Sequence, residues 1–119
     1  MLTTLSLLFA AAFAAQDTDA PAALEPIALT VEYVGDPATP RGKAFVALLE
    51  EHFTSVEAVD AKQLGAPADS AQRFAGADVL LVDADLTGHL PDGYGKPMVV
   101  ISGLGVRTAE GLGAKLDWL

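Results

Sequence analysis

The chain contains no cysteine, and this absence excludes several classes of protein. A disulfide-stabilised domain, a thiol enzyme and a lipoprotein anchored through cysteine all need this residue. Methionine occurs only as Met1 and Met98, which excludes a methionine-rich metal site. Basic residues are also scarce, and the formal net charge is −9. Because an acidic surface repels phosphate backbones and anionic lipid headgroups, we expect no nucleic-acid partner and no membrane partner for the mature chain.

The first residues form an apolar run that is typical of a signal peptide. Leu7–Ala15 carries no charged side chain, and Ala12-Phe13-Ala14 supplies the small residues of a cleavage site. We therefore predict a signal peptide over residues 1–14 and an exported protein, periplasmic or secreted. The alternative is a short N-terminal core helix, although no polar stripe interrupts the run as an amphipathic helix requires. A membrane span needs about 20 apolar residues, and Asp17 ends the run too early.

The rest of the chain divides into a lead-in and one small domain. Residues 15–26 are rich in Ala, Pro and acidic residues and predict a flexible segment. Residues 27–119 alternate between strand and helix patterns, which predicts a small α/β domain. The expected strands are Ile27–Val34, Val56–Val59, Ala77–Asp83, Pro97–Ile101 and Ala114–Leu119, the last with continued helix as its alternative. The expected helices are Arg41–Phe53, Asp69–Phe74 with Asp69 as its cap, and Thr108–Gly113.

Right-handed crossovers between these elements predict a three-layer sandwich. Its sheet would be mainly parallel and flavodoxin-like, with strand order 2-1-3-4-5. In such a sheet the ligand crevice lies beyond the carboxyl ends of the strands, where the strand order switches. Any site should therefore draw on the loops that follow the strands.

Three of these loops carry the candidate ligand-binding residues. Asp36 follows the first strand, and Asp83 and Asp85 follow the central one. These carboxylates predict either ordinary turn and cap formation or, with His89 from the same loop, a site that could take a divalent cation. No other cofactor is evident, and no metal ligand set is assigned.

Ser102 and Gly103 complete the candidate set. The segment Ser102–Gly105 lies between a predicted strand and a predicted helix, so it predicts a tight turn. A glycine turn at this place can also present backbone N–H groups to an anion. It lacks the full dinucleotide fingerprint, and no G-x-S-x-G surrounds the serine, so no catalytic residue is assigned.

Three segments resemble the first half of a known superfamily. They are Ala44–Leu49, Ala77–Asp83 and Gly95–Ile101, the last with a Gly-Lys-Pro before its strand. The stretch is similar to the class I glutamine amidotransferase-like superfamily, and within it to the trehalose-utilisation (ThuA-like) family. In the superfamily, the position of Ser102 holds a catalytic cysteine or, in ThuA-like proteins, often a histidine. Because this sequence has serine there, the family's catalytic residues are not carried over.

The strand that ends at Asp83, followed by Lys96-Pro97, also resembles a phosphoreceiver domain. In that family Asp83 would be the phospho-acceptor. The first strand lacks the adjacent acidic pair, the segment Leu86–Lys96 is short for a receiver helix, and export would separate the protein from a cytoplasmic kinase. The receiver interpretation is therefore disfavoured.

Two functions from different classes follow from these patterns. The first is an exported, non-catalytic binding or accessory domain that resembles a shortened ThuA-like fold, with an unidentified small molecule or protein as its partner. The second is a hydrolase or sugar-processing enzyme that uses Asp36, Asp83, Asp85 and His89, with or without a metal ion. A further hypothesis is that the domain is incomplete, because the apolar segment Lys115–Leu119 ends the sequence without a polar tail.

Overall fold

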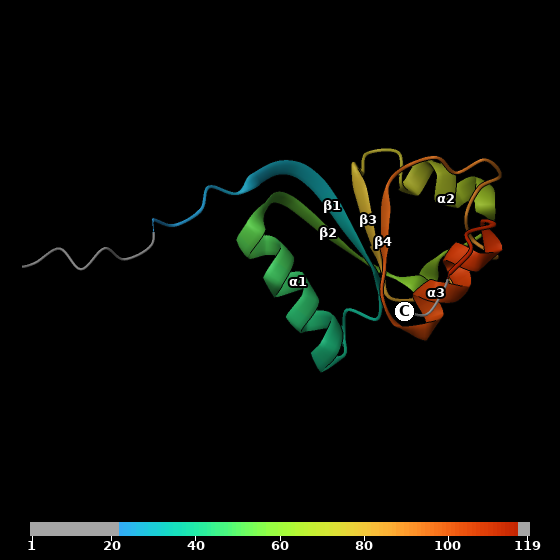
Figure 1. Ribbon diagram of the computed structural model, residues 1–119, viewed down its shortest axis with the longest axis horizontal. Coiled ribbons are helices and arrows are strands. Elements are labelled where there is room, and N and C mark those ends of the chain that lie inside the picture. Colours follow the sequence, from blue (N-terminus) through green and yellow to red (C-terminus); the bar gives the residue numbers. More distant parts are fainter. Residues whose placement is uncertain (1–21, 117–119) are drawn as a thin grey trace, which may run out of the picture.

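The computed structural model describes residues 22–116, which form an α/β domain with one small, all-parallel sheet (Figure 1). The strands are β1 (Ile27–Gly35), β2 (Phe53–Asp60), β3 (Val79–Val82) and β4 (Met98–Val100). The α-helices are α1 (Pro40–His52), α2 (Pro67–Arg73) and α3 (Ser102–Gly111), and a 3-10 turn, η1, covers Ala61–Gln63. No helix in this described part is both long enough and apolar enough to cross a lipid bilayer.

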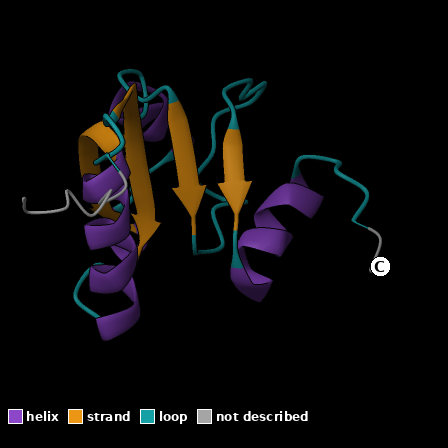
Figure 2. Ribbon diagram, turned by 60° about the vertical axis from the view of Figure 1, so that its left-hand side comes forward, coloured by secondary structure: helices purple, strands orange, loops and turns teal. Residues whose placement is uncertain are grey.

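The strand order is β2-β1-β3-β4, and every neighbouring pair is parallel. All carboxyl ends of the strands therefore meet at one edge of the sheet, as the arrowheads in Figure 2 show. From β1 the chain moves outward to β2, and from β3 it moves outward to β4. The switch in direction consequently falls between β1 and β3, at the centre of the sheet.

Helices lie on both sides of the sheet, α1 on one side and α2 and α3 on the other (Figure 1). Successive residues of a strand point to opposite faces, so β1 supplies both cores. Val31 and Tyr33 pack with Leu49 of α1, while Val34 packs with Phe74 beside α2. The apolar run of β3 divides in the same way, with Leu80 and Val82 fully buried toward α2. The strands need apolar side chains on both faces because both faces are covered.

Helix α1 begins where the local sequence favours a helix start. Thr39 is the N-cap, and its hydroxyl accepts a hydrogen bond from the Gly42 N–H at 3.0 Å. Pro40 follows at the first helical position, where its missing N–H costs nothing. The aromatic ring of Phe45 then stacks on Tyr33 with 6.0 Å between ring centroids, which fixes the helix against β1.

Helix α2 is short, and its carboxyl end is bound by a lysine from a later segment. The Lys96 ammonium donates to the carbonyl oxygens of Phe74, Ala75 and Ala77 at 3.1, 2.6 and 2.7 Å. These carbonyls lie at the negative end of the helix, where a cation is favourable. Lys96 therefore joins the end of α2 to the start of β4.

Several predicted elements differ from the structure. The sheet has four strands within residues 22–116, and the predicted fifth strand is wrong for Ala114–Leu116, which form a loop. Gly113, with φ of +82°, follows Leu112, the C-cap of α3, in the left-handed conformation that commonly terminates a helix. The remaining residues of that predicted strand, 117–119, lie outside the described part, as do the predicted signal peptide and most of the lead-in.

Two helix starts were also predicted wrongly. Asp69 lies inside the first turn of α2, whose N-cap is Ala66, because Pro67 takes the first helical position. Ser102–Gly105 is the first turn of α3 and not a separate loop. Gly105 is required there for packing, since a Cβ at this position would lie 2.7 Å from the Val82 carbonyl oxygen.

Candidate functional site

A pocket of about 460 Å³ opens at the carboxyl edge of the sheet, where β1 and β3 diverge toward their outer neighbours. This volume lies in the range of small-molecule sites. The loops after β1, β3 and β4 and the first turns of α1 and α3 supply its walls. The lining residues are Tyr33, Asp36, Thr39, Arg41, Asp83, Ser102, Gly103, Leu104 and Arg107. We call this pocket the crevice.

Asp83 lies at the centre of the crevice and is held by an arginine. Its side chain is only 7% exposed, and its Oδ2 and Oδ1 accept hydrogen bonds from Arg41 Nε and Nη2 at 2.7 and 3.3 Å. Burial alone raises the pKa of the Asp83 carboxyl, but the hydrogen bonds from Arg41 and Ser102 outweigh it and bring the pKa below its ordinary value. Asp83 is therefore a charged carboxylate at neutral pH and a poor proton acceptor.

Tyr33 reaches the same carboxylate from β1. Its hydroxyl lies 3.4 Å from Asp83 Oδ2 and donates toward it. Burial, together with the negative charge of Asp83, raises the pKa of the Tyr33 hydroxyl. The phenol stays protonated and remains a hydrogen-bond donor at the floor of the crevice.

Asp36 is paired as well. Its Oδ2 accepts from the Lys62 ammonium at 2.6 Å, and its Oδ1 accepts from the Ala38 N–H at 3.3 Å. The hydrogen bond from Lys62 is the main cause that lowers the pKa of the Asp36 carboxyl. The two carboxylates predicted at this edge are thus both present, but each already has a cationic partner.

Ser102 adopts a backbone conformation that side chains rarely take. Its φ is +66°, and it is the only residue other than glycine with a positive φ in the described part of the chain. Holding a residue with a Cβ in this region costs free energy, and such strain clusters at functional sites. The serine occupies the junction of β4 and α3, so its hydroxyl faces the crevice beside Asp83.

The N-terminus of α3 also opens into the crevice. Its N-cap residue is Ile101, which cannot cap through a side chain, and its first turn carries no acidic residue. The first N–H groups of a helix lack intrahelical partners and favour a negative charge. Ser102, Gly103 and Leu104 carry these groups, and Arg107 lines the same wall one turn further along α3.

The structure does not place Asp85 and His89 in the crevice. Asp85 accepts a hydrogen bond from the Thr87 N–H at 3.1 Å, which is the ordinary turn role of an aspartate. His89 belongs to the turn that follows, where its backbone N–H donates to the Leu86 carbonyl oxygen at 2.7 Å. Of the six residues predicted for the site, the structure brings Asp36, Asp83, Ser102 and Gly103 together and leaves these two outside.

The crevice has no ligand set that suits a metal ion. Within residues 22–116 no three His, Asp or Glu side chains come close enough to hold one. The pairing of Asp36 with Lys62 and of Asp83 with Arg41 explains this, since each carboxylate that could bind a cation already binds a protein cation. What the arrangement offers instead is a set of hydrogen-bond donors around an acidic floor.

Five residues of the crevice were not predicted from the sequence: Tyr33, Thr39, Arg41, Leu104 and Arg107. Arg41 was detectable, because a residue in the first turn after the loop of β1 must lie at the carboxyl edge. Arg107 was not, because the segment before it was taken for a turn and not for the start of the helix.

Comparison of the chain with family models, with curated proteins and with solved structures finds no match.

Proposed function

We propose that this protein is an exported, non-catalytic binding domain whose crevice takes a small anionic ligand, a carboxylate or a phosphate. The fold would be a shortened relative of ThuA-like domains, with Ser102 at the position of the superfamily's nucleophile. Export is supported by the apolar run Leu7–Ala15 and the small residues before Ala15.

The observation that carries this proposal is the uncapped start of α3. Its free N–H groups and the cationic residue Arg107 line one pocket, in which the Ser102 hydroxyl already donates to Asp83. A helix N-terminus stabilises an anion through both its hydrogen-bond donors and its dipole. The acidic side chains of the crevice do not oppose this, because Lys62 and Arg41 neutralise them.

The same geometry argues for binding over catalysis. A serine nucleophile needs a neighbouring base that can accept its proton near neutral pH. The carboxylate beside Ser102 is Asp83, whose lowered pKa makes it a weak base. His52 and His89 both lie outside the residues that line the crevice.

Titration with inorganic phosphate and with acetate, followed by ¹H–¹⁵N NMR, tests the binding function. We expect shifts concentrated at Ser102, Gly103 and Leu104. Arg107→Gln should weaken anion binding several-fold. The control Lys43→Gln removes an equal charge from an exposed position of α1 and should leave anion binding unchanged. Equal affinity in both variants, or shifts spread along the surface, would contradict the proposal.

One observation favours a second candidate, a serine hydrolase. A strained residue at a sharp strand-to-helix turn is how nucleophilic serines are presented in some hydrolases, and Ser102 has this placement. Treatment with a fluorophosphonate probe decides the matter. Labelling that disappears in Ser102→Ala would establish the hydrolase, and absence of labelling would favour the binding domain.

The metal-assisted form of the enzyme has its own test. Calorimetric titration with calcium, magnesium and zinc should give no binding heat in the wild-type protein. Binding that is lost in Asp83→Asn would reverse this expectation and assign the crevice to a cation.

Export is tested separately. Expression with the natural start in a bacterial host should give a mature N-terminus near Ala15 by Edman sequencing or mass spectrometry. Recovery of the intact chain from the cytoplasm, with Met1 retained, would contradict the export proposal.

A further inference from the structure

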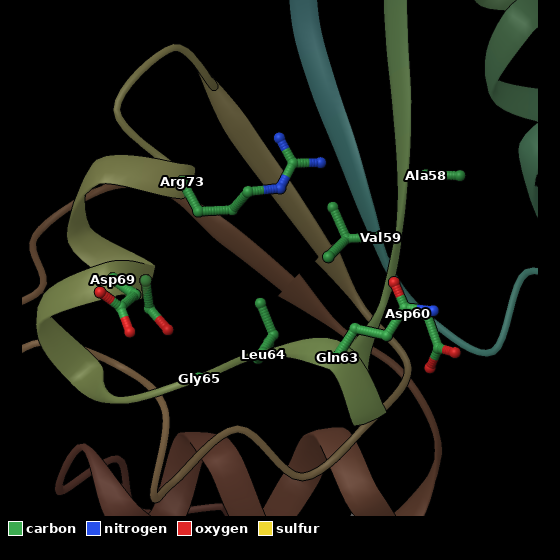
Figure 3. Close-up of a pocket in the computed structure, with 9 residues that line it drawn as sticks. Ala58, Val59, Asp60, Gln63, Leu64, Gly65, Asp69 and Arg73 are labelled. Atoms are coloured by element: carbon green, nitrogen blue, oxygen red, sulfur yellow. The ribbon is translucent and has the colours of Figure 1, made fainter.

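Two glutamates on neighbouring strands share one arginine of α2. Glu32 of β1 and Glu57 of β2 are partners in the register of the sheet, so their side chains lie on the same face. Arg73 reaches from α2 toward the strands (Figure 3), and its Nη1 lies 3.3 Å from Glu32 Oε1 and 3.1 Å from Glu57 Oε2. We call Glu32 and Glu57 the carboxyl pair. When both members are ionised, the single guanidinium leaves one negative charge without a counterion.

The two members of the carboxyl pair differ in their access to water. The Glu57 side chain is 55% exposed, whereas the Glu32 side chain is only 3% exposed. Glu32 Oε1 faces the shared guanidinium, but Glu32 Oε2 is buried and has no hydrogen-bond partner in the part of the chain that the structure describes. A buried carboxylate needs donors at its oxygens to offset the loss of hydration. The charged form of Glu32 is therefore poorly stabilised in the folded protein.

Among the described residues, the other groups around Glu32 do little to stabilise its charge. Lys96 attracts Glu32 from the segment before β4, but its ammonium already donates to three carbonyl oxygens at the end of α2. Tyr94 belongs to the same segment, and burial together with the charge of Glu32 raises the pKa of its phenol to about 12. Its hydroxyl therefore stays protonated and uncharged, and it has no described hydrogen-bond partner. On β3 the neighbour of Glu32 is the apolar side chain of Leu80.

A proton on Glu32 removes the unfavourable charge. Burial, opposed by the charge of Arg73 and reinforced by that of Glu57, raises the pKa of the Glu32 carboxyl. The protonated carboxyl can donate a hydrogen bond to the Glu57 carboxylate, which lies within reach. Arg73 then neutralises Glu57 alone. Repulsion between the two members of the carboxyl pair is thereby replaced by attraction.

Ionised Glu32 can regain water only if the elements that cover it move. Arg73 and the loop after α2, at Gly76 and Ala77, line a pocket of about 130 Å³ together with the carboxyl pair. Arg73 also supplies the ion pairs between α2 and the strands. Helix α2 has seven residues and no side-chain cap at its N-terminus, so its place on the sheet depends on tertiary contacts. The charge of the carboxyl pair therefore acts on the shortest α-helix of the described domain.

We propose that the carboxyl pair is a pH-sensitive switch, which holds α2 firmly on the sheet in acid and weakens this contact as the pH rises. The pKa of Glu32 is higher in the folded protein than in the unfolded chain. Its contribution to stability is therefore complete below the unfolded pKa and is lost as the pH rises through the folded pKa. This direction is opposite to that of Asp83 in the crevice, whose carboxylate has a lowered pKa.

Hydrogen exchange of the full chain, followed by ¹H–¹⁵N NMR from about pH 5 to about pH 8, tests the switch. Protection factors are compared, because they remove the intrinsic pH dependence of amide exchange. The amides of Ser70 and Phe74 form hydrogen bonds of α2, and their protection should rise several-fold on acidification. The amide of Lys43 in α1 should show no such rise. A parallel rise in α1 and α2, or no rise in α2, would overturn the proposal.

Glu32→Gln gives the side chain a permanently neutral group of nearly the same shape. Protection of α2 in this variant should be independent of pH and should equal that of the wild type in acid. The control Glu50→Gln removes an equal charge from an exposed position of α1 and should keep the pH dependence of the wild type. If Glu32→Gln keeps this pH dependence as well, or protects α2 less than the wild type does at neutral pH, the switch does not depend on Glu32.

Titration of the Glu32 side-chain carboxyl by ¹³C NMR uses the wild-type protein and does not depend on the folding of a variant. Its midpoint should lie above the ordinary glutamate value of about 4.3. Glu57→Gln should move the midpoint to lower pH, because Arg73 then pairs with Glu32 alone and no second carboxylate repels it. A purely structural role of Glu57 would leave the midpoint where it is. A wild-type midpoint at or below the ordinary value, or one that Glu57→Gln does not move, would contradict the proposal.

Discussion

The left-handed backbone at Ser102 predicts an unusual order of stability between two substitutions. Ser102→Ala and Ser102→Gly both remove the hydroxyl, so any difference between them reflects the backbone at φ of +66°. In this backbone region the Cβ of alanine lowers the free energy of unfolding by roughly 1–2 kcal/mol, whereas glycine has no Cβ to strain. Glycine in turn lowers the free energy of unfolding by about 0.4–1 kcal/mol, because it increases the entropy of the unfolded chain. The net expectation is that Ser102→Gly is more stable than Ser102→Ala by about 1 kcal/mol.

Urea denaturation of both variants measures this difference directly. Ala47 provides a matched control, because it is exposed within α1. There the usual helical preference holds, and Ala47→Gly should lower the free energy of unfolding by about 1 kcal/mol. The two positions should therefore give differences of opposite sign. If Ser102→Ala proves equal to or more stable than Ser102→Gly, the serine does not hold a left-handed conformation and the argument from strain fails.

Three further perturbations follow from particular contacts. Thr108→Val should lower the free energy of unfolding, measured by urea denaturation, by about 1–3 kcal/mol. The reason is that the buried Thr108 hydroxyl forms hydrogen bonds with two backbone groups of the loop after β3. Thr108→Ser keeps the hydroxyl and should retain most of the stability. Gly42→Ala should destabilise by about 1–3 kcal/mol, because its Cβ would lie 2.1 Å from a backbone oxygen of the loop after β1, whereas Gly76→Ala meets nothing within 4 Å and should be tolerated. Asp83→Asn should cost about 1 kcal/mol at pH 7, discounted for its exposed arginine partner. The pKa of Asp83 is lower in the folded protein than in the unfolded chain. The carboxylate therefore stabilises the fold above the unfolded pKa, and this contribution is lost as the pH falls through the folded pKa. The difference in free energy of unfolding between wild type and Asp83→Asn should accordingly disappear in acid, and a difference that stays constant from neutral pH into acid would exclude the carboxylate as its cause.

The core of the sheet could be predicted from sequence because burial on two faces leaves a clear pattern. The run Val79–Val82 and the β-rich segment from Ile27 predicted β3 and β1, and both are confirmed. Helix α1 was predicted from Arg41, one residue after its observed start at Pro40, and the Thr39 cap and Pro40 are strong local signals for that start. Local chemistry and long-range packing agree at these positions.

The site was harder to predict because it depends on side chains that meet across the fold. Asp83 and Asp85 look alike in sequence, yet Asp83 pairs with Arg41, 42 residues away, and Asp85 caps its own turn. The segment Ser102–Gly105 misled for a similar reason. Its glycines suggested a turn, but Gly105 serves a close approach to the Val82 carbonyl that only the folded sheet creates.

The lysine that joins α2 to β4 has a consequence for the order of folding. Helix α2 has seven residues and no side-chain cap at its N-terminus, so it is too short to persist alone in water. Its carbonyl oxygens find their cation only when Lys96, more than 20 residues later, reaches them. Packing of Phe74 on Val34 can hold α2 against the earlier strands, but its end receives this cation only after the segment leading into β4 is in place. On a ribosome, α2 would therefore reach its full stability only when the chain through Lys96 had emerged.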